Sequence, residues 1–381
     1  MQPMPQKAAL IAHEISSVGG IQKVTLDVAH ALESHGVSSV CFSLREPHSD
    51  QLIEGLPNHC LEPRNRRIKD FYRKHPEPFL LFHLRRVAPD LDLLIATHFH
   101  LLGLSVGLAA KLGKPVWLMA HGIEIWREWN PREQSWIRDV DRIIAVSRYT
   151  ASSVGSRLEG EHRDKITVIP NMVDTDLFTP GGSPHAGTTK IILTVGRLAA
   201  EERYKGHDLV ILALPRLKQR VGTPVQYWIV GEGDDRARLE RLAARENVSE
   251  MVEFKGRLSR EELIEAYRAC DVYAMPSYVS TRADGTWTGE GFGLTYIEAA
   301  ACETPVIACE TGGQTDAMID GKTGLLVEPT VEAVTNALLE LLSNPRTARR
   351  MGKAGRAYVS ERFGKESYRE KWAKLLVQSD K

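Results

Sequence analysis

Residues 288–298 read TGEGFGLTYIE, and they lie between a stretch typical of a strand and a stretch typical of a helix. Upstream, DVYAMPS (271–277) is a short apolar run, and downstream LTYIEAAACE (294–303) leads into the apolar run PVIACE (305–310). A strand, a helix and a second strand in this order indicate parallel strands joined by a crossover helix. The glycines of the quoted stretch therefore mark the point where the chain enters that helix.

The start of this helix has the composition of an anion-binding site. Gly291 and Gly293 flank Phe292, so the backbone N–H groups at the helix start are exposed to a ligand. Glu290 precedes the helix and Glu298 lies one to two turns into it, and carboxylates accept hydrogen bonds from sugar hydroxyls. A diol, a phosphate and a second diol are the parts of a nucleotide-sugar. A surface helix with glutamates in its first turns is the alternative that these residues leave open.

The same alternation of apolar runs and amphipathic segments extends along most of the chain. KAALIAHE (7–14), LDLLIAT (91–97), DRIIAVS (141–147), KIILTVGRL (190–198) and VQYWIVGEG (225–233) are typical of strands. Continuous apolar runs favour strands that are buried on both faces of a parallel sheet. The sequence therefore predicts an α/β protein with doubly wound sheets, whose ligands bind at the carboxyl ends of the strands.

A change of amino-acid composition divides the chain. VIPNMVDTDLFTPGGSPHAGTTK (168–190) is rich in proline, glycine and small polar residues, which favours a linker. We therefore expect an N-terminal domain over residues 1–170, a linker over 171–190 and a C-terminal domain over 191–355.

Composition narrows the class of protein. The 381 residues are 43% hydrophobic and 26% charged, which is usual for soluble proteins, and a formal net charge of zero disfavours nucleic acid as a partner. Five cysteines without a CxxC pair disfavour a disulfide framework and suit a reducing compartment. Without a signal peptide or an apolar run of about 18 residues, we expect a cytoplasmic protein whose membrane contact is at most peripheral, on the inner face of the cytoplasmic membrane.

EGFGLTYIE (290–298), an E-x7-E pattern, and the following stretch AAACETPVIACETGGQTDAMIDGKTGLLVEP (299–329) closely resemble family 4 of the retaining glycosyltransferases. The resemblance covers nearly the whole chain and is strongest over residues 191–329. It implies the GT-B fold, in which two Rossmann-like domains face each other across a cleft. It also implies a C-terminal helix, over residues 356–381, that returns to the N-terminal domain.

The resemblance assigns roles to residues at the start of the helix. Glu290 would contact hydroxyls of the donor sugar, and Glu298 would hold the ribose hydroxyls. The backbone of Phe292, Gly293 and Leu294 would meet the diphosphate. The donor would bind mainly to the C-terminal domain and the acceptor to the N-terminal one.

Two cations in TVGRLAAEERYKGHD (194–208) suit a departing diphosphate. Arg197 follows a predicted strand and Lys205 lies in the loop beyond it, and the family carries an Arg and a Lys at these positions. Fixed cations stabilise the negative charge that develops on the leaving group, and losing one such group costs about 100- to 1000-fold in rate. Solvated loop charges are the alternative.

The N-terminal half contributes two further candidates. Gly19 and Gly20 lie between the first strand and the first helix, where backbone can approach a phosphate. His121 follows the predicted strand in LMAHGIEIW (118–126) and matches the family's His-Gly step. We assign His121 to positioning a sugar hydroxyl rather than to general-base chemistry, although most of the 13 histidines are expected to be structural.

A glycine-rich turn resembles the nucleotide pocket of the family. Gly231 and Gly233 follow a predicted strand, but Arg236 stands where a dinucleotide fingerprint has its third glycine, which disfavours an NAD-dependent dehydrogenase. By the resemblance, Gly231 lines the nucleotide pocket, and Arg257 and Leu258 contact the base through backbone groups.

No metal or other cofactor is expected. Asp174 and Asp176 mimic the metal-binding DxD motif of another glycosyltransferase architecture, but they fall in a stretch that resembles the linker of family 4. Arg197, Lys205 and the helix dipole can take the place of a cation at the diphosphate.

A basic segment over residues 64–86 is the candidate for a membrane or acceptor contact. It has eight basic residues against two acidic ones, with aromatic residues interleaved. Such a face suits anionic lipid or an anionic acceptor. A solvated helix packed by its aromatic residues is the alternative.

The sequence thus predicts a metal-independent retaining glycosyltransferase that moves a hexose to a lipid-linked or oligosaccharide acceptor in glycan or cell-envelope biosynthesis. STRADGTWTGEGFGLTYIEA (280–299) resembles the subset that uses GDP-mannose to mannosylate phosphatidylinositol mannosides, and a UDP-hexose is the alternative donor. A nucleotide-sugar epimerase and a non-catalytic sugar-nucleotide-binding subunit are the rival functions. A phosphorylase on the same scaffold is disfavoured because no pyridoxal lysine is indicated.

Overall fold

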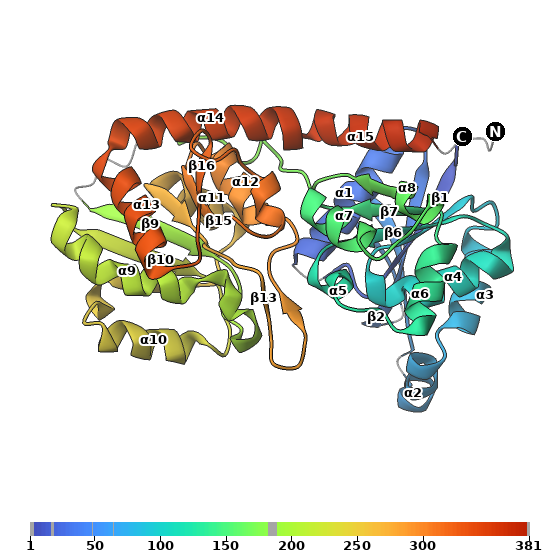
Figure 1. Ribbon diagram of the computed structural model, residues 1–381. Helices are drawn as coiled ribbons and strands as arrows, with labels where there is room; N and C mark the ends of the chain where they lie inside the picture. The colour runs from blue at the N-terminus through green and yellow to red at the C-terminus, as the bar shows by residue number, and fades with distance from the viewer. Residues whose placement is uncertain (1–3, 17–18, 48, 64, 182–188, 379–381) are drawn as a thin grey trace. The chain divides into compact units, whose positions relative to one another are not determined.

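The computed structural model describes residues 4–16, 19–47, 49–63, 65–181 and 189–378 (Figure 1). The chain forms two compact units, of which the first contains residues 1–172 and 366–381 and the second contains residues 173–365. Helix α14 (Pro345–Phe363) belongs to the second unit because it packs against α12 (Leu294–Ala301), so the division falls ten residues later than the expected boundary at 356. Of the stretch expected to be a linker (171–190), the described residues from Val173 onward belong to the second unit, and residues 182–188 lie outside the described residues.

The first unit is built on an eight-stranded sheet with the order β3-β4-β2-β1-β5-β6-β7-β8. All neighbouring strands are parallel except β3, which pairs antiparallel with β4. The predicted parallel strands are confirmed, and the β3–β4 hairpin at the sheet edge is an addition to them. The strands are β1 (Lys7–Ala12), β2 (Ser38–Pro47), β3 (Ser49–Ile53), β4 (Leu56–Glu62), β5 (Leu93–Ala96), β6 (Val116–Ala120), β7 (Arg142–Ala145) and β8 (Ile166–Val168).

Helices flank this sheet because its central strands are apolar on both faces. All residues of β5 and β6 are buried, which is the pattern of a sheet covered by helices. The helical elements are α1 (Gly20–Glu33), α2 (Arg66–Lys74), α3 (Glu77–Val87), η1 (Phe99–Leu101), α4 (Leu102–Leu112), α5 (Ile123–Trp126), α6 (Pro131–Asp139), α7 (Arg148–Gly155) and α8 (Glu161–Asp164). Helix α2 contacts the sheet at β4, where its Lys69 and Arg73 pair with Glu62.

The C-terminal helix α15 (Lys365–Gln378) completes the first unit. Its Trp372 is fully buried, and the Trp372 ring stacks on that of Trp117 in β6 with 6.5 Å between ring centroids. Tyr368 meets the Trp372 ring edge-on. The predicted return of the C-terminal helix to the N-terminal domain is confirmed, with the helix beginning at Lys365.

The second unit is built on a six-stranded parallel sheet with the order β11-β10-β9-β12-β15-β16. Its strands are β9 (Lys190–Val195), β10 (Val225–Val230), β11 (Val252–Gly256), β12 (Val272–Ala274), β15 (Val306–Cys309) and β16 (Gly324–Val327). Its helical elements, besides α12 and α14, are η2 (Ala200–Lys205), α9 (His207–Arg220), α10 (Arg236–Arg245), η3 (Ser249–Met251), α11 (Arg260–Ala269), η4 (Gly313–Asp316) and α13 (Val331–Ser343). The two Rossmann-like sheets agree with the predicted fold class.

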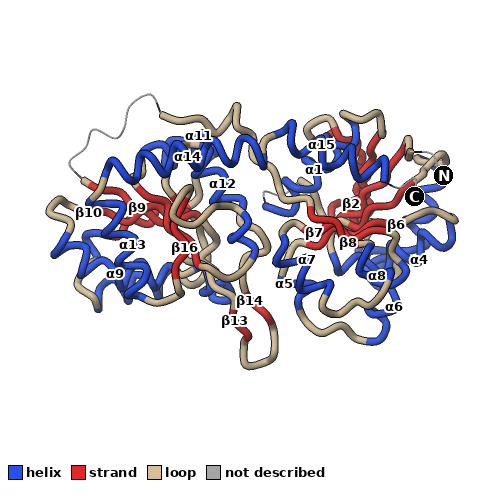
Figure 2. Tube along the Cα trace, turned by 45° about the horizontal axis from the view of Figure 1, so that its top comes forward, coloured by secondary structure: helices blue, strands red, loops and turns tan. Residues whose placement is uncertain are grey.

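Local signals explain several boundaries of the second unit. A capping box begins α11, since the Glu262 N–H donates to the Ser259 hydroxyl and the Ser259 N–H donates to the Glu262 carboxylate. The stretch after β12 contains a short hairpin of β13 (Ser280–Thr281) and β14 (Trp287–Thr288), seen in Figure 2. Its Asp284-Gly285 step, with Gly285 at φ +81°, is a typical hairpin turn.

Candidate functional site

The segment that leads into α12 is held in place by close backbone contacts. A Cβ on Gly313 would lie 1.8 Å from the Gly291 carbonyl oxygen, and the Gly313 N–H donates to the Glu290 carbonyl over 2.8 Å. Gly293 has φ +87°, and a Cβ there would lie 2.3 Å from the Tyr296 ring. Position 313 therefore requires glycine because an added Cβ would collide with backbone, and position 293 favours glycine because of its positive φ.

The start of α12 presents backbone N–H groups rather than side chains. The Phe292 side chain is buried and meets the Phe363 ring edge-on, with 5.3 Å between ring centroids. Leu294 is the first residue of the helix, and no side chain in the described part of the chain caps its N-terminus. Uncapped N–H groups at a helix start attract an anion.

Lys205 and Glu290 form an ion pair beside this helix start. The Lys205 Nζ lies 2.5 Å from the Glu290 Oε1, and the two side chains are 11% and 14% exposed. Burial alone would lower the pKa of the Lys205 ammonium, but the negative charges of Glu290 and Glu202 outweigh it and hold that pKa well above its usual range. Lys205 is thus a fully charged cation at any physiological pH.

The loop that carries Lys205 is fixed against the strand beside it. Gly206 has φ +77°, and a Cβ there would lie 2.4 Å from the Pro276 carbonyl oxygen. The Tyr278 N–H donates to the Tyr204 carbonyl over 2.9 Å. Because β9 and β12 are neighbours in the sheet, these contacts bring the loop after β9 against the residues that follow β12.

Glu202 is a member of this group that the sequence did not single out. Its carboxylate is 13% exposed, pairs with the Arg197 guanidinium through Oε1 and has Oε2 3.8 Å from the Lys205 Nζ. Arg197 itself is largely exposed. One carboxylate therefore links both predicted leaving-group cations through the 3-10 turn of η2.

Glu298 lies deeper than the other candidates. It is on the second turn of α12, 9% exposed, and one of its oxygens accepts a hydrogen bond from the Tyr267 hydroxyl over 3.0 Å. Burial, reinforced by the Glu298 charge, raises the pKa of Tyr267 well above its usual range, so Tyr267 remains a donor. The Glu298 carboxylate, which is expected to hold ribose hydroxyls, thus already accepts a hydrogen bond from Tyr267.

The glycine turn after β10 touches the loop after β9. Gly231 has φ +135°, and a Cβ there would lie 2.0 Å from the Gly196 carbonyl oxygen. The Gly231 N–H donates to the Gly256 carbonyl over 2.8 Å, at the end of β11. Arg257, which is exposed, and Leu258, which is half-buried, follow directly. The structure therefore brings Arg197, Gly231 and Arg257 to the carboxyl ends of three adjacent strands.

The candidates of the first unit lie at the carboxyl ends of β1 and β6. Gly20 begins α1, and Gly19 precedes it with extended backbone at φ −167°, while residues 17 and 18 of the same loop lie outside the described residues. His121 follows β6, where its ring N–H donates from Nε2 to the Thr97 carbonyl over 2.8 Å and its backbone N–H donates to the Glu124 carboxylate over 2.7 Å. Hydrogen bonds to its own unit thus hold the His121 ring in place.

Three further histidines surround this position and were not singled out from the sequence. His13 follows β1, and His98 and His100 follow β5. The His98 ring lies 5.9 Å from that of His13 and 6.2 Å from that of His121. Burial is the main cause that lowers the pKa of His13 to about 4 and of His98 to about 3, so both rings are neutral at pH 7.

Asp174 and Asp176, the residues of the DxD pattern, share one lysine. The Lys365 Nζ lies 2.9 Å from the Asp174 carboxylate and 3.3 Å from that of Asp176. This lysine occupies the place between the carboxylates that a metal ion would need.

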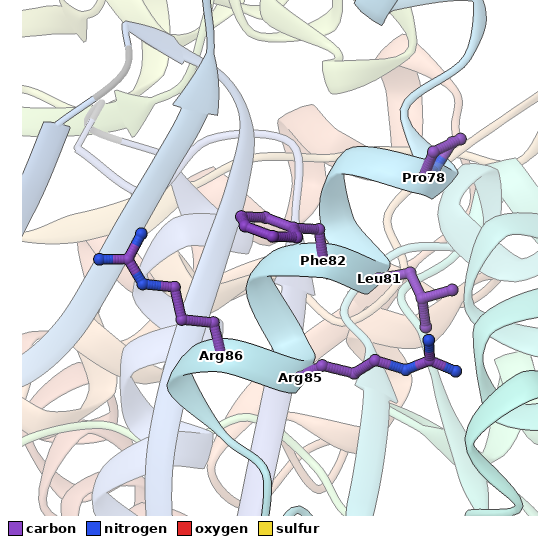
Figure 3. Close-up of a pocket in the computed structure, with 5 residues that line it drawn as sticks. All are labelled: Pro78, Leu81, Phe82, Arg85 and Arg86. Carbon is purple, nitrogen blue, oxygen red and sulfur yellow. The ribbon is translucent and has the colours of Figure 1, made fainter.

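The basic segment forms α2 and α3, with Arg64 outside the described residues. Tyr72 is buried, whereas Phe71 and Phe82 are 57% and 62% exposed. Figure 3 shows Phe82 and Arg86 on one side of α3 and Leu81 and Arg85 on the other, around a surface hollow. The aromatic residues therefore divide between packing inward and facing solvent.

Comparisons with known proteins place the chain in a family. Residues 18–177 match the family described as Glycosyltransferase Family 4, and residues 179–358 match the family described as Glycosyl transferases group 1. A GDP-mannose-dependent alpha-(1-6)-phosphatidylinositol monomannoside mannosyltransferase from Mycolicibacterium smegmatis is 34% identical over 324 residues, which cover 79% of this chain and 81% of that protein. The chain belongs to glycosyltransferase family 4.

Other relatives of this glycosyltransferase carry a different activity in their names. A D-inositol 3-phosphate glycosyltransferase from Stackebrandtia nassauensis is 32% identical, with 91% of this chain and 86% of that protein covered. Both relatives transfer glycosyl groups, so the enzyme class is common to them.

Solved structures show the GT-B fold of this glycosyltransferase. Sucrose-phosphate synthase from Thermosynechococcus elongatus superimposes with a TM-score of 0.78 at 24% identity, covering 98% of each chain. HepE from Anabaena, in complex with UDP and glucose, superimposes with a TM-score of 0.76 at 18% identity, covering 97% of this chain and 99% of that one. In the described part of the chain, no helix has the length and apolar character needed to span a bilayer.

Proposed function

We propose that this glycosyltransferase moves a hexose from a nucleotide-sugar to a lipid-linked or oligosaccharide acceptor in glycan or cell-envelope biosynthesis, with retention of the anomeric configuration and without a metal ion. The observation that carries this proposal is the buried Lys205–Glu290 pair beside the uncapped start of α12. A fixed cation and free N–H groups suit a diphosphate, and an adjacent carboxylate suits sugar hydroxyls.

The proposed reaction takes place on one face of the sugar. The bond between the anomeric carbon and the diphosphate oxygen breaks, while the acceptor hydroxyl oxygen forms its bond to the same face of that carbon. The acceptor proton passes to the departing diphosphate, whose remaining charge is stabilised by Lys205, Arg197 and the N–H groups at the start of α12. Glu290 orients the hexose through its hydroxyls, and the His121 ring positions a further hydroxyl.

GDP-mannose is the donor that we favour. The relative from Mycolicibacterium smegmatis is named as GDP-mannose-dependent, and residues 280–299 carry the sequence resemblance to that subset. HepE was solved with UDP and glucose, which keeps a UDP-hexose as the second candidate. Both candidates share the diphosphate that Lys205 is proposed to bind.

A panel of nucleotide-sugars tests the donor. The protein is incubated with GDP-mannose, UDP-glucose and UDP-N-acetylglucosamine, with and without phosphatidylinositol-mannoside and oligosaccharide acceptors, and products are analysed by mass. We expect a hexose to be added to an acceptor from one donor, with the α-linkage retained and with turnover unchanged by EDTA. Isomerised donor in the absence of acceptor would instead identify an epimerase, and the absence of turnover with every donor would favour a non-catalytic subunit.

We also propose that the segment formed by α2 and α3 contacts anionic lipid, as a lipid-linked acceptor requires. Exposed Ile68, Phe71 and Phe82 accompany a cluster of cations on these two helices. Apolar side chains among cations suit a membrane surface with negative charge. The cations in the described part are Arg66, Arg67, Lys69, Arg73, Lys74, Arg85 and Arg86.

Vesicle sedimentation tests this contact. We expect binding to vesicles that contain phosphatidylglycerol, weak binding to pure phosphatidylcholine, and loss of binding in Phe71→Ser/Phe82→Ser. Leu52→Ser is the control, because Leu52 is an apolar residue on β3 that is even more exposed than Phe71 and Phe82. Equal binding to both lipids, or equal loss in the Leu52 variant, would contradict the proposal.

A further inference from the structure

Three histidines gather at the carboxyl ends of β1 and β5. The ligating nitrogens of His13, His98 and His100 all lie within 4.8 Å of one another. The His98 and His100 rings are 4.7 Å apart, and His13 and His98 are partly buried while His100 is exposed. The cluster therefore has two anchored members and one at the surface.

The backbone of this cluster is fixed by the sheet. β1 and β5 are neighbours, and the Thr97 N–H donates to the Ile11 carbonyl over 3.1 Å. The Arg45 N–H donates to the His13 carbonyl over 2.7 Å, and the Leu101 N–H donates to the His98 carbonyl over 2.9 Å. These backbone hydrogen bonds fix the points from which the three histidine side chains extend.

We propose that His13, His98 and His100 bind one divalent transition-metal ion of the zinc class. Imidazole nitrogen is a preferred ligand of zinc, copper and nickel. Three histidines leave the fourth tetrahedral position to water. With zinc–nitrogen bonds of about 2.0–2.1 Å, tetrahedral ligands stand ~3.4 Å apart. A small rotation of the exposed His100 ring and of its partners closes the cluster to that spacing.

Two contacts act against the metal and limit its affinity. The His98 Nδ1 accepts a hydrogen bond from the His100 N–H over 3.2 Å, and an ion bound at this nitrogen replaces that bond. The positive charge of Arg45 acts on His13, opposed by the negative charge of Glu14. Because Arg45 repels a cation, its replacement by a neutral residue should strengthen metal binding.

The ligands of the metal site are not residues assigned to the departing diphosphate. They belong to the first unit, whereas Lys205, Glu290 and α12 belong to the second. The His98 ring stacks on His121, so a bound ion would stand beside the ring that the proposed function assigns to a sugar hydroxyl. The experiment for this site therefore measures metal binding itself rather than glycosyl transfer.

Cobalt titration of the full-length protein tests the site. The protein is first treated with EDTA and dialysed, cobalt(II) is added while visible absorption is recorded, and zinc is then added as a competitor. We expect one ion per chain, the absorption bands of tetrahedral cobalt, and displacement by zinc. His98→Asn and His13→Asn should each weaken binding at least about tenfold, since even outer partners of metal ligands are worth roughly 10- to 100-fold.

Matched variants separate this site from incidental binding. His100→Ala changes an exposed side chain and so tests the site even where a buried histidine variant fails to fold. Arg45→Gln should tighten cobalt binding several-fold, and His75→Ala, an exposed histidine on the C-terminal side of α2, should leave binding unchanged. Absence of stoichiometric binding, or binding that the His100 and His98 variants leave intact, would overturn the proposal.

Discussion

Lys205 is the residue on which the proposed chemistry depends most. It is a nearly buried cation between the carboxylates of Glu290 and Glu202. We expect Lys205→Gln to lower kcat/KM by about 100- to 1000-fold, because the charge on the departing diphosphate loses a fixed cation. Steady-state kinetics with the identified donor measure this loss.

The same substitution has a structural effect that must be separated from the catalytic one. Removing one partner of a buried ion pair destabilises by about 3–5 kcal/mol, since it leaves the other charge uncompensated. Glu290→Gln combined with Lys205→Gln should recover part of that stability in urea unfolding but none of the activity. A double variant that regained turnover along with stability would show that Lys205 is structural.

Glu202 is expected to compete with the diphosphate for the same two cations. Glu202→Gln frees Arg197 and Lys205 from this carboxylate, so UDP or GDP should bind more tightly. The Arg197–Glu202 pair, in which Arg197 is largely exposed, is worth up to about 1 kcal/mol, which corresponds to roughly fivefold in Kd. Calorimetric titration measures the change. Weaker binding in this variant would instead mean that Glu202 positions the cations.

Residue-level contacts were only partly predictable from the sequence. Arg197, Lys205 and Glu290 were found because a long motif carries them. Glu202 was missed because its contacts depend on the 3-10 turn of η2, and the histidines at positions 13, 98 and 100 were missed because they meet only where the segments after β1 and β5 come together. A single residue with ordinary neighbours in sequence gives no signal for such a contact.

At the scale of elements, the entry to α12 depends on how closely Gly313 approaches Gly291. Gly313→Ala would push the Gly291 carbonyl away, since the added Cβ would lie 1.8 Å from it. We expect loss of nucleotide binding together with lower thermal stability, because the N–H groups at the start of α12 shift.

Gly222→Ala is the control for this substitution. Gly222 has φ +73° and no atom within 4 Å of an added Cβ, so an alanine there adds backbone strain of about 1–2 kcal/mol without a collision. It should leave nucleotide binding intact. Equal losses of binding in both variants would show that the effect comes from general instability.

Elements with a strong apolar signal were predictable, and those without it were not. β5 and β6 are continuous apolar runs because helices cover both faces of their sheet. β3 and β13 carry mostly polar residues and form only through pairing with a neighbouring strand. The helices α2 and α3 were recognised as a basic segment, but their division at Pro76 and the outward direction of Phe82 depend on packing.

At the scale of the whole molecule, the C-terminal helix ties the end of the chain to the first unit. Trp372→Ala removes a fully buried side chain from its packing on Trp117, which costs about 3–5 kcal/mol. Because α15 belongs to the first unit, hydrogen exchange should accelerate in peptides from β6 and stay unchanged in peptides from β9 and β10. Uniform acceleration in both units would contradict this assignment.

The two-domain organisation was predictable because two series of strands and helices flank a change of composition. The boundary between the second unit and the C-terminal helix was not predictable from the sequence. The sequence from Pro345 to the C-terminus gives helical signals throughout, and only packing against α12 assigns α14 to the second unit. The direction in which an amphipathic helix docks is set by the partner surface rather than by its own periodicity.

The central claim is that the diphosphate of a nucleotide binds between Lys205 and the N-terminus of α12. A crystal structure of the protein with GDP or UDP tests it most directly. We predict diphosphate oxygens within hydrogen-bond distance of the Lys205 Nζ and of the N–H groups at Gly293 and Leu294, with the ribose at Glu298. A nucleotide bound elsewhere, with the Lys205–Glu290 pair unchanged beside it, would contradict the account.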